Sequence, residues 1–223
     1  MRRVGLLALV VLVSGCGSTS TSGRVTVWIT RDRGAHVLHV ARVPAGLTAM
    51  QALSRVAKVK SRYGGRYVRA VDGLGEHGRT AWFYYVNGYL ADRSAAEYRL
   101  HAGDVEWWDY RSWKDPAQDP VVVGSFPEPF LHGYAGKRRR TVILGGAGVS
   151  ALARRLHATV APPGAGLLAR DVNVISVAAG AHTSADLTYT GSTSPGSPVR
   201  LSFTGDPKLL LRPWPFRFHY SLR

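Results

Sequence analysis

The aromatic run AWFYYVNG at residues 81–88 places the strongest constraint on the fold of this chain. Side chains alternate between the two faces of a strand. One face therefore carries Trp82, Tyr84 and Val86, and the other carries Phe83 and Tyr85. Asn87–Gly88 favours a type I′ hairpin turn, because both central residues of that turn need positive φ. We predict a hairpin strand that is aromatic on both faces, so each face needs a cover or a ligand.

The segments around this strand predict an α+β domain at residues 24–113. A helical pattern follows Thr48, with Gln51 completing a capping box, and Met50 and Leu53 lie on one helical face. Strand patterns occupy residues 25–29, 36–43, 66–71, 82–86 and 105–110. Two strands, one helix and further strands are typical of a sheet with a helix packed across it. A β-grasp-like arrangement, a mixed sheet with one packed helix, is the simplest such fold.

Residues 114–129 contain four prolines, which predicts a linker between two domains. Beyond it, residues 130–223 are expected to form a second small α+β domain. Its predicted elements are strands at 141–144, 173–178, 186–189, 199–203 and 216–222, and a helix at 149–157.

The N-terminus is typical of a secreted bacterial protein. Arg2 and Arg3 precede an apolar run that is about half of the ~20 residues a membrane-spanning helix needs, so residues 1–15 are predicted to be a signal peptide. The run ends in VSGC, which resembles the bacterial lipobox and implies cleavage before Cys16 and attachment of a diacylglyceryl group to its sulfur. The alternative is a signal peptide with an incidental cysteine. Residues 16–23 would then form the lipidated cysteine and a flexible tether.

The formal net charge is +15, and loss of the two signal-peptide arginines leaves about +13. Outside the cytoplasm this charge faces lipid headgroups or envelope polymers, so we expect no nucleic-acid partner. The basic run at 137–140 is interpreted as a solvated or headgroup-facing patch. The expected location is extracytoplasmic, with a lipid anchor in the bacterial cell membrane.

Three segments carry a family resemblance: PAGLTAMQALSRVA (44–57), AWFYYVNGYLAD (81–92) and AAEYRLHAGDVEWWDY (95–110). Together they are similar to the bacterial family related to the C-terminal domain of transcobalamin and intrinsic factor. The resemblance covers about residues 24–113 and implies a β-grasp fold of the soluble-ligand-binding type. In the animal proteins this domain closes over one face of cobalamin. The α-helical barrel that accompanies it there is absent here, and no binding residue carries over.

The aromatic residues are the candidate ligand-binding side chains, because aromatic rings offer a large flat surface with a polar tip on Tyr and Trp. The candidates are Trp82, Tyr84, Tyr85, Tyr89, Trp107, Trp108 and Tyr110. Such a platform suits a planar macrocycle, with a corrinoid as the candidate ligand, or a sugar ring. In the alternative, the second domain covers this face.

Signals for catalysis and for metals are weak. GGAGVSA at residues 145–151 formally fits a dinucleotide fingerprint, but a glycine-rich turn between a strand and a helix explains it with fewer requirements. Asp104 and Glu106 are a weak pair for glycoside cleavage, and Asp104 is expected to fix its turn. The histidines are scattered, and Cys16 is the only cysteine, so no metal site is predicted.

The sequence therefore predicts a surface-anchored, non-enzymatic lipoprotein that binds a small ligand, as an accessory to uptake with a transporter or envelope partner. The alternative is an envelope scaffold or protein-interaction module.

Overall fold

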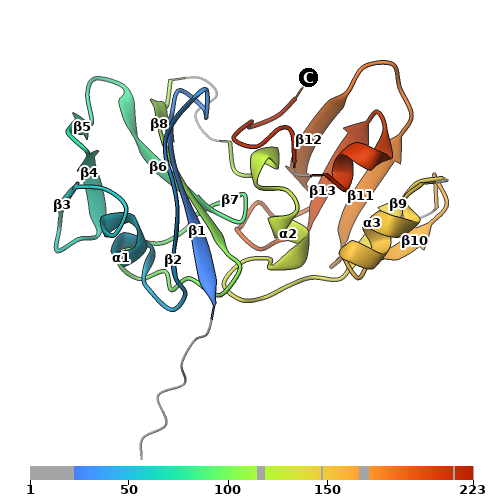
Figure 1. The fold of residues 1–223 in the computed structure, drawn as a ribbon, viewed down its shortest axis with the longest axis horizontal. Coiled ribbons are helices and arrows are strands. Elements are labelled where there is room, and N and C mark those ends of the chain that lie inside the picture. Colours follow the sequence, from blue (N-terminus) through green and yellow to red (C-terminus); the bar gives the residue numbers. More distant parts are fainter. Residues whose placement is uncertain (1–22, 115–118, 147, 166–170, 213, 223) are drawn as a thin grey trace, which may run out of the picture.

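A computed structural model describes residues 23–223 except 115–118, 147, 166–170, 213 and 223. The predicted signal peptide and Cys16 lie outside the described residues. Two five-stranded sheets lie side by side, the first built by the N-terminal half and the second by the C-terminal half (Figure 1). Within the described residues, no helix has the length and apolar character to cross a membrane.

The first sheet is mixed and has the strand order β2-β1-β8-β6-β7. Its strands are β1 (Arg24–Arg31), β2 (His36–Pro44), β6 (Thr80–Val86), β7 (Tyr89–Leu90) and β8 (Val105–Ser112). The central strands β1 and β8 are parallel, and every other pair is antiparallel. Helix α1 (Ala49–Ser54) packs on one face through Ala49, Ala52 and Leu53, which is the α+β arrangement expected.

The predicted capping box is present: the Thr48 hydroxyl accepts from the Gln51 amide, and the Gln51 side chain accepts from the Thr48 amide. The helix is shorter than the pattern suggested, because the chain turns after Ser54 and the β-branched Val59 starts a strand. A small antiparallel sheet follows, made of β3 (Val59–Arg62), β4 (Tyr67–Val71) and β5 (Leu74–Gly75).

The hairpin turn has the predicted backbone, with φ of 51° at Asn87 and 85° at Gly88. The Asn87 side chain donates to the Asp104 carboxylate and to the Gly133 carbonyl, and it accepts from the Val105 amide. A Cβ at Gly88 would lie 2.8 Å from the Val122 carbonyl oxygen. This turn therefore joins the first sheet to the segment that leads into the second.

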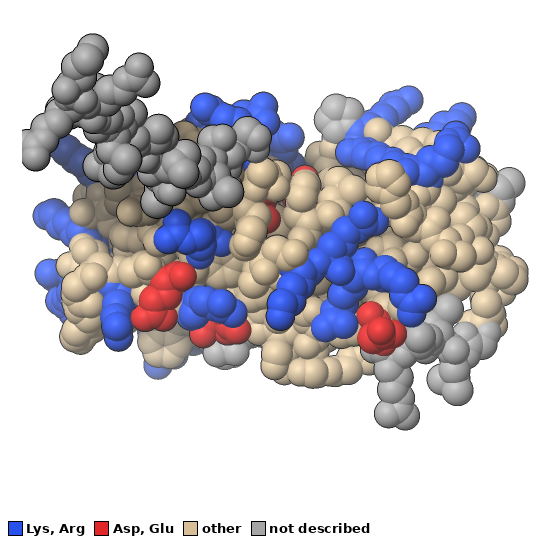
Figure 2. Space-filling model, turned by 90° about the horizontal axis from the view of Figure 1, so that it is seen from below, with Lys and Arg blue, Asp and Glu red and all other residues tan. Residues whose placement is uncertain are grey.

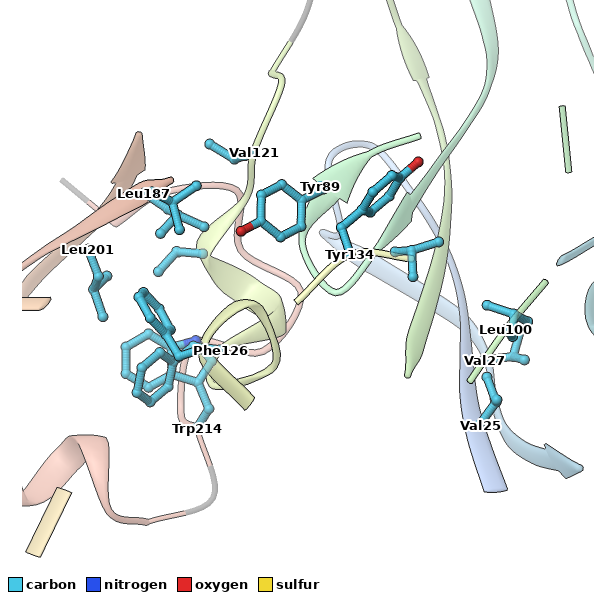
Figure 3. Packing of buried hydrophobic residues seen from close by; sticks show 14 of the residues in the cluster. Val25, Val27, Tyr89, Leu100, Val121, Phe126, Tyr134, Leu187, Leu201 and Trp214 are labelled. Carbon is cyan, nitrogen blue, oxygen red and sulfur yellow. The ribbon is translucent and has the colours of Figure 1, made fainter. Parts of the chain in front are cut away.

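Residues 119–129 of the predicted linker are packed into the fold. Val121, Val122, Val123 and Phe126 are buried, and the Val122 amide donates to the Gly88 carbonyl. The segment contains the short helices η1 (Val123–Ser125) and α2 (Glu128–Leu131). Its apolar side chains place it in a hydrophobic core that both halves share, where Tyr89 lies near Tyr134, and Phe126 near Trp214 (Figure 3).

The second sheet has the strand order β10-β9-β11-β13-β12, and all pairs except β12–β13 are parallel. Its elements are β9 (Thr141–Leu144), α3 (Ser150–Arg155), β10 (Thr159–Ala161), β11 (Asn173–Ala178), β12 (Ser184–Tyr189), β13 (Val199–Thr204) and η2 (Pro207–Leu210). The parallel pairing and the β9-α3-β10 crossover were not predicted, because strand order depends on contacts distant in sequence.

The strand predicted at residues 216–222 is wrong. This segment forms turns, with φ of 69° at Phe218, and only Leu222 pairs, as a single bridge to Ala185. Phe218 and Tyr220 instead pack onto the first sheet, and Phe216 packs against Trp214, so these aromatic side chains are packed without a ladder of backbone hydrogen bonds.

Candidate functional site

The first face of the N-terminal sheet is covered by α1 and the small sheet. Trp82 Nε1 donates to the Leu74 carbonyl at 2.9 Å, and the Tyr110 hydroxyl donates to the Gly75 carbonyl at 2.5 Å. Tyr84 stacks on Trp108 with ring centroids 4.8 Å apart. The indole N–H groups and the hydroxyls of these rings thus donate hydrogen bonds within the protein.

Glu106 lies on this same face and is completely buried. Trp108 Nε1 donates to Oε1 at 2.6 Å, whereas Oε2 has no hydrogen-bond partner among the described residues. Burial without a cation raises the pKa of this carboxyl well above its usual range, against the smaller opposing effect of the Trp108 hydrogen bond. The raised pKa favours the protonated, uncharged form of this buried side chain.

The second face is covered by the C-terminal segment. Phe218 packs against Trp28 with centroids 4.8 Å apart, and Tyr220 packs against Trp107 at 5.3 Å. The Tyr220 hydroxyl donates to the buried Asp109 carboxylate at 2.8 Å. Phe218 and Tyr220 therefore cover this aromatic face, so it is not exposed to a ligand.

A buried arginine completes this second layer. Arg111 lies 4.0 Å from the Phe83 ring centroid and donates to the Tyr85 hydroxyl, which in turn donates to the Asp119 carbonyl. Burial raises the pKa of Tyr85 and of Tyr220. Both hydroxyls are therefore neutral hydrogen-bonding groups within the interior.

The seven aromatic candidates thus lie on packed faces. Five have less than one tenth of their surface exposed: Trp82, Tyr85, Tyr89, Trp107 and Trp108. Tyr84 and Tyr110 are partly buried. Across the sheet Trp82 meets Tyr110, Tyr84 meets Trp108 and Tyr85 meets Trp107, but these pairs divide between two faces. Tyr89 packs separately, against Tyr134 and Tyr189.

The large cavity of the molecule lies on the second sheet and has a volume of about 1160 Å³. Alternation along the strands explains its position: Ile143, Ile175 and Leu201 point into the shared core, with α3 on that side. Leu144, Val174, Ser176 and Arg200 point the other way and line the cavity. Parallel sheets usually have both faces covered, so a face that the described residues leave uncovered is a candidate site.

Two arginines supply the positive charge of this cavity. Arg200 donates to the Ser176 hydroxyl at 3.3 Å, and within the described part of the chain it forms no ion pair with a carboxylate. Arg139 donates to the carbonyls of Gly196 and Asp171. The Asp171 carboxylate also borders the cavity and lies 3.9 Å from Arg140.

Ser176, Arg139 and Arg200 were not among the residues predicted from the sequence to bind a ligand. The alternation of residues 173–178 and 199–204 could have indicated two of them. It places Ser176 and Arg200 on the face of the sheet away from Ile175 and Leu201. What the sequence could not give is the pairing of β11 with β13, which sets Val174 beside Arg200 and Ser176 beside Ser202.

The glycine-rich motif forms the turn between β9 and α3. A Cβ at Gly145 would lie 2.8 Å from Val149 Cγ1, so glycine permits close packing of the turn on the helix. The helix has six residues. The β9-α3-β10 unit that a dinucleotide site requires is present, but the close packing explains this glycine without a ligand.

No cluster of three or more His, Cys, Asp or Glu side chains that could hold a metal occurs among the described residues. A smaller cavity of about 340 Å³ lies where the two halves meet, bordered by residues 119–121 and 186–189 together with Tyr220. Its position between packed segments makes it a gap in the junction of the two halves.

One family model matches part of the N-terminal half. Residues 46–112 match the family described as "Domain of unknown function (DUF4430)". No curated protein matches the sequence. Among solved structures, the chain is similar to a "putative metal binding protein" from Ruminococcus gnavus, with 16% identity and a TM-score of 0.33 over 40% of this chain and 97% of that one. It is also similar to haptocorrin in complex with Cbi, with 16% identity and a TM-score of 0.33 over 40% of this chain and 25% of haptocorrin.

Proposed function

We propose that this chain is an extracytoplasmic, lipid-anchored, non-enzymatic protein that binds a small ligand on the open face of its second sheet. The observation that carries the proposal is the cavity of about 1160 Å³ over β9, β11 and β13. Its walls combine apolar side chains with a few polar groups, which is the usual composition of a small-molecule site.

The lipid anchor rests on the lipobox-like VSGC sequence and is supported by the charge around the start of the described chain. The Gly23 carbonyl accepts a hydrogen bond from the Ala45 amide, and the Arg24 and Arg99 side chains donate to the nearby carbonyls of Arg42 and Gly46, so two guanidinium groups lie near this point. Figure 2 shows the corresponding side of the molecule, where Lys and Arg outnumber Asp and Glu. Such a surface favours anionic headgroups.

Membrane fractionation tests the anchor. We expect the wild-type chain in the membrane fraction of the bacterial host, and we expect Cys16→Ser to appear in the soluble extracytoplasmic fraction. Equal membrane association of the two proteins would contradict lipidation at Cys16.

A corrinoid is the first ligand class to test, because of the transcobalamin-like segments of the N-terminal half. The full chain with Cys16→Ser is titrated with cobalamin, with cobinamide and with the neutral fluorophore N-phenyl-1-naphthylamine. The fluorophore is expected to bind in a saturable manner. Ser176→Trp, which fills the cavity, is expected to abolish this binding, whereas Thr159→Trp, at an exposed position on β10, leaves it unchanged. Absence of saturable binding by every probe would contradict the proposal, and absence of corrinoid binding alone would exclude that ligand class.

The second candidate function is an envelope scaffold with a transporter or envelope partner. It is favoured by the packing of Phe218 and Tyr220 over the second face of the first sheet, which joins both halves into one continuous core. Retention of a specific envelope protein by both the wild-type chain and Ser176→Trp, without probe binding by either, would favour this function.

A further inference from the structure

We propose that the ligand of the open sheet face is a small amphipathic organic anion, whose carboxylate, phosphate or sulfonate is bound by Arg200 and Ser176. This inference rests on the proposed function, because it concerns the same cavity. It adds the chemical class of the ligand and the residues that recognise it.

Arg200 lies on β13, between β11 and the edge strand β12. In the sheet register it is next to Val174 of β11 on one side and Thr188 of β12 on the other. Its guanidinium carries five N–H donors, and one of them donates to the Ser176 hydroxyl at 3.3 Å. The remaining donors have no protein acceptor among the described residues, so they are available to an anion. A guanidinium fork matches the oxygens of a carboxylate or phosphate in bidentate geometry.

The charges that face the cavity favour an anion. Arg139 and Arg200 both border it, whereas Asp171 is the acidic residue in its described wall. The Asp171 side chain is well exposed, with 69% of its surface accessible, and Arg140 lies 3.9 Å away. Its negative charge is therefore screened by water and opposed by a third arginine.

The rest of the wall indicates an apolar body for this anion. Leu144, Val174 and the two prolines Pro163 and Pro198 border the same space. A fully hydrophilic ion such as free phosphate would leave these surfaces in contact with water. An organic acid with an apolar body covers them and places its anionic group at Arg200.

A matched pair of fluorophores tests this inference. 1-Anilinonaphthalene-8-sulfonate and N-phenyl-1-naphthylamine share one aromatic body and differ by the sulfonate. We expect the full chain with Cys16→Ser to bind the sulfonate about tenfold more tightly than the neutral compound. The difference corresponds to about one charge-assisted hydrogen bond between the sulfonate and Arg200. We expect Arg200→Gln to remove that preference and to leave the affinity for the neutral compound unchanged.

The control variant is Arg154→Gln, which removes the same charge from an exposed position on α3, on the other side of the sheet. It is expected to keep the preference for the sulfonate. Arg200→Lys keeps the charge but loses the fork, and it is expected to retain part of the preference. Thermal melting of each variant shows whether it is folded.

Four outcomes overturn the inference. If the chain with Cys16→Ser alone binds the two fluorophores with equal affinity, the site does not prefer an anion, although the proposed function stands. An equal loss of preference in Arg154→Gln and Arg200→Gln shows a general effect of net charge. Concentration-dependent dimerisation that Ser176→Trp abolishes assigns the face to a second copy of the chain. If neither fluorophore binds, both the inference and the proposed function fail.

Discussion

The two sheets of this molecule differ in how they are covered. The first, dense in aromatic residues, has α1 and the small sheet on one face and Phe218 and Tyr220 on the other. The second, built mainly from aliphatic and hydroxyl side chains, has a core on one face and a cavity on the other. The aromatic residues therefore form the packed core of the first sheet. The candidate site lies on the second sheet, which has few aromatic residues.

The largest expected effect is at the centre of the doubly covered sheet. Trp107 of β8 is fully buried and packs against Trp28 of β1 and against Tyr220. Trp107→Ala is expected to lower the free energy of unfolding by about 3–5 kcal/mol, the cost of removing a large buried ring. Ser202→Ala, exposed on β13, is expected to stay within about 0.5 kcal/mol of the wild type. Urea denaturation measures the free energy of unfolding of both variants. Equal losses would contradict the conclusion that the first sheet is covered on both faces and the second on one.

The contact between the C-terminal segment and the first sheet is expected to have a smaller but clear effect. Tyr220→Phe removes the hydroxyl that donates to Asp109, whose carboxylate also accepts from Thr30 and from the amides of Arg33 and Gly34. Since these other donors remain, we expect a loss of about 1–2 kcal/mol in urea denaturation. Tyr220→Ala also removes the ring over Trp107 and should cost more. If both variants are as stable as the wild type, the C-terminal segment is not a structural cover.

Glu106 gives a pH-dependent test of the first face. Its folded-state pKa is raised, so above the unfolded-state pKa the unfolded chain releases a proton that the folded chain retains. Stability contributed by this group therefore falls as pH rises, by at most about 1.4 kcal/mol per pH unit. Glu106→Gln should remove this slope, with an advantage over the wild type that grows from pH 5 to pH 8. Parallel stability curves for the two proteins would show that Glu106 is not buried in protonated form.

The smallest effect is expected at the junction of the two halves. The hydrogen bond to Glu128 raises the pKa of His132, and partial burial acts in the opposite direction. A raised histidine pKa stabilises the fold below the unfolded value, and this stabilisation is lost as pH rises through the folded value. Because the ring is partly exposed, Glu128→Gln should cost only about 0.5 kcal/mol at pH 5.5 and nothing at pH 8.5. A cost independent of pH would mean that the pair acts by packing alone.

Local signals in the sequence predicted the first half of the fold well. The Asn87–Gly88 turn, the capping box at Thr48 and the alternation of residues 80–86 depend on neighbours in sequence, and each is present. The cover over Trp107 comes from Tyr220, more than one hundred residues away, and no local pattern encodes that contact. The same limitation hid the candidate site, because Ser176 meets Arg200 only once β11 and β13 pair in parallel.

We propose that the ligand site lies on the uncovered face of the second sheet, whereas the aromatic side chains of the first sheet form a core. Backbone amide chemical-shift mapping by NMR, during titration with 1-anilinonaphthalene-8-sulfonate, tests this most directly. We expect the largest changes in amide chemical shift at residues 172–178 and 197–200, around Ser176 and Arg200. Largest shifts at residues 80–86 and 105–112, with the second sheet unaffected, would contradict it.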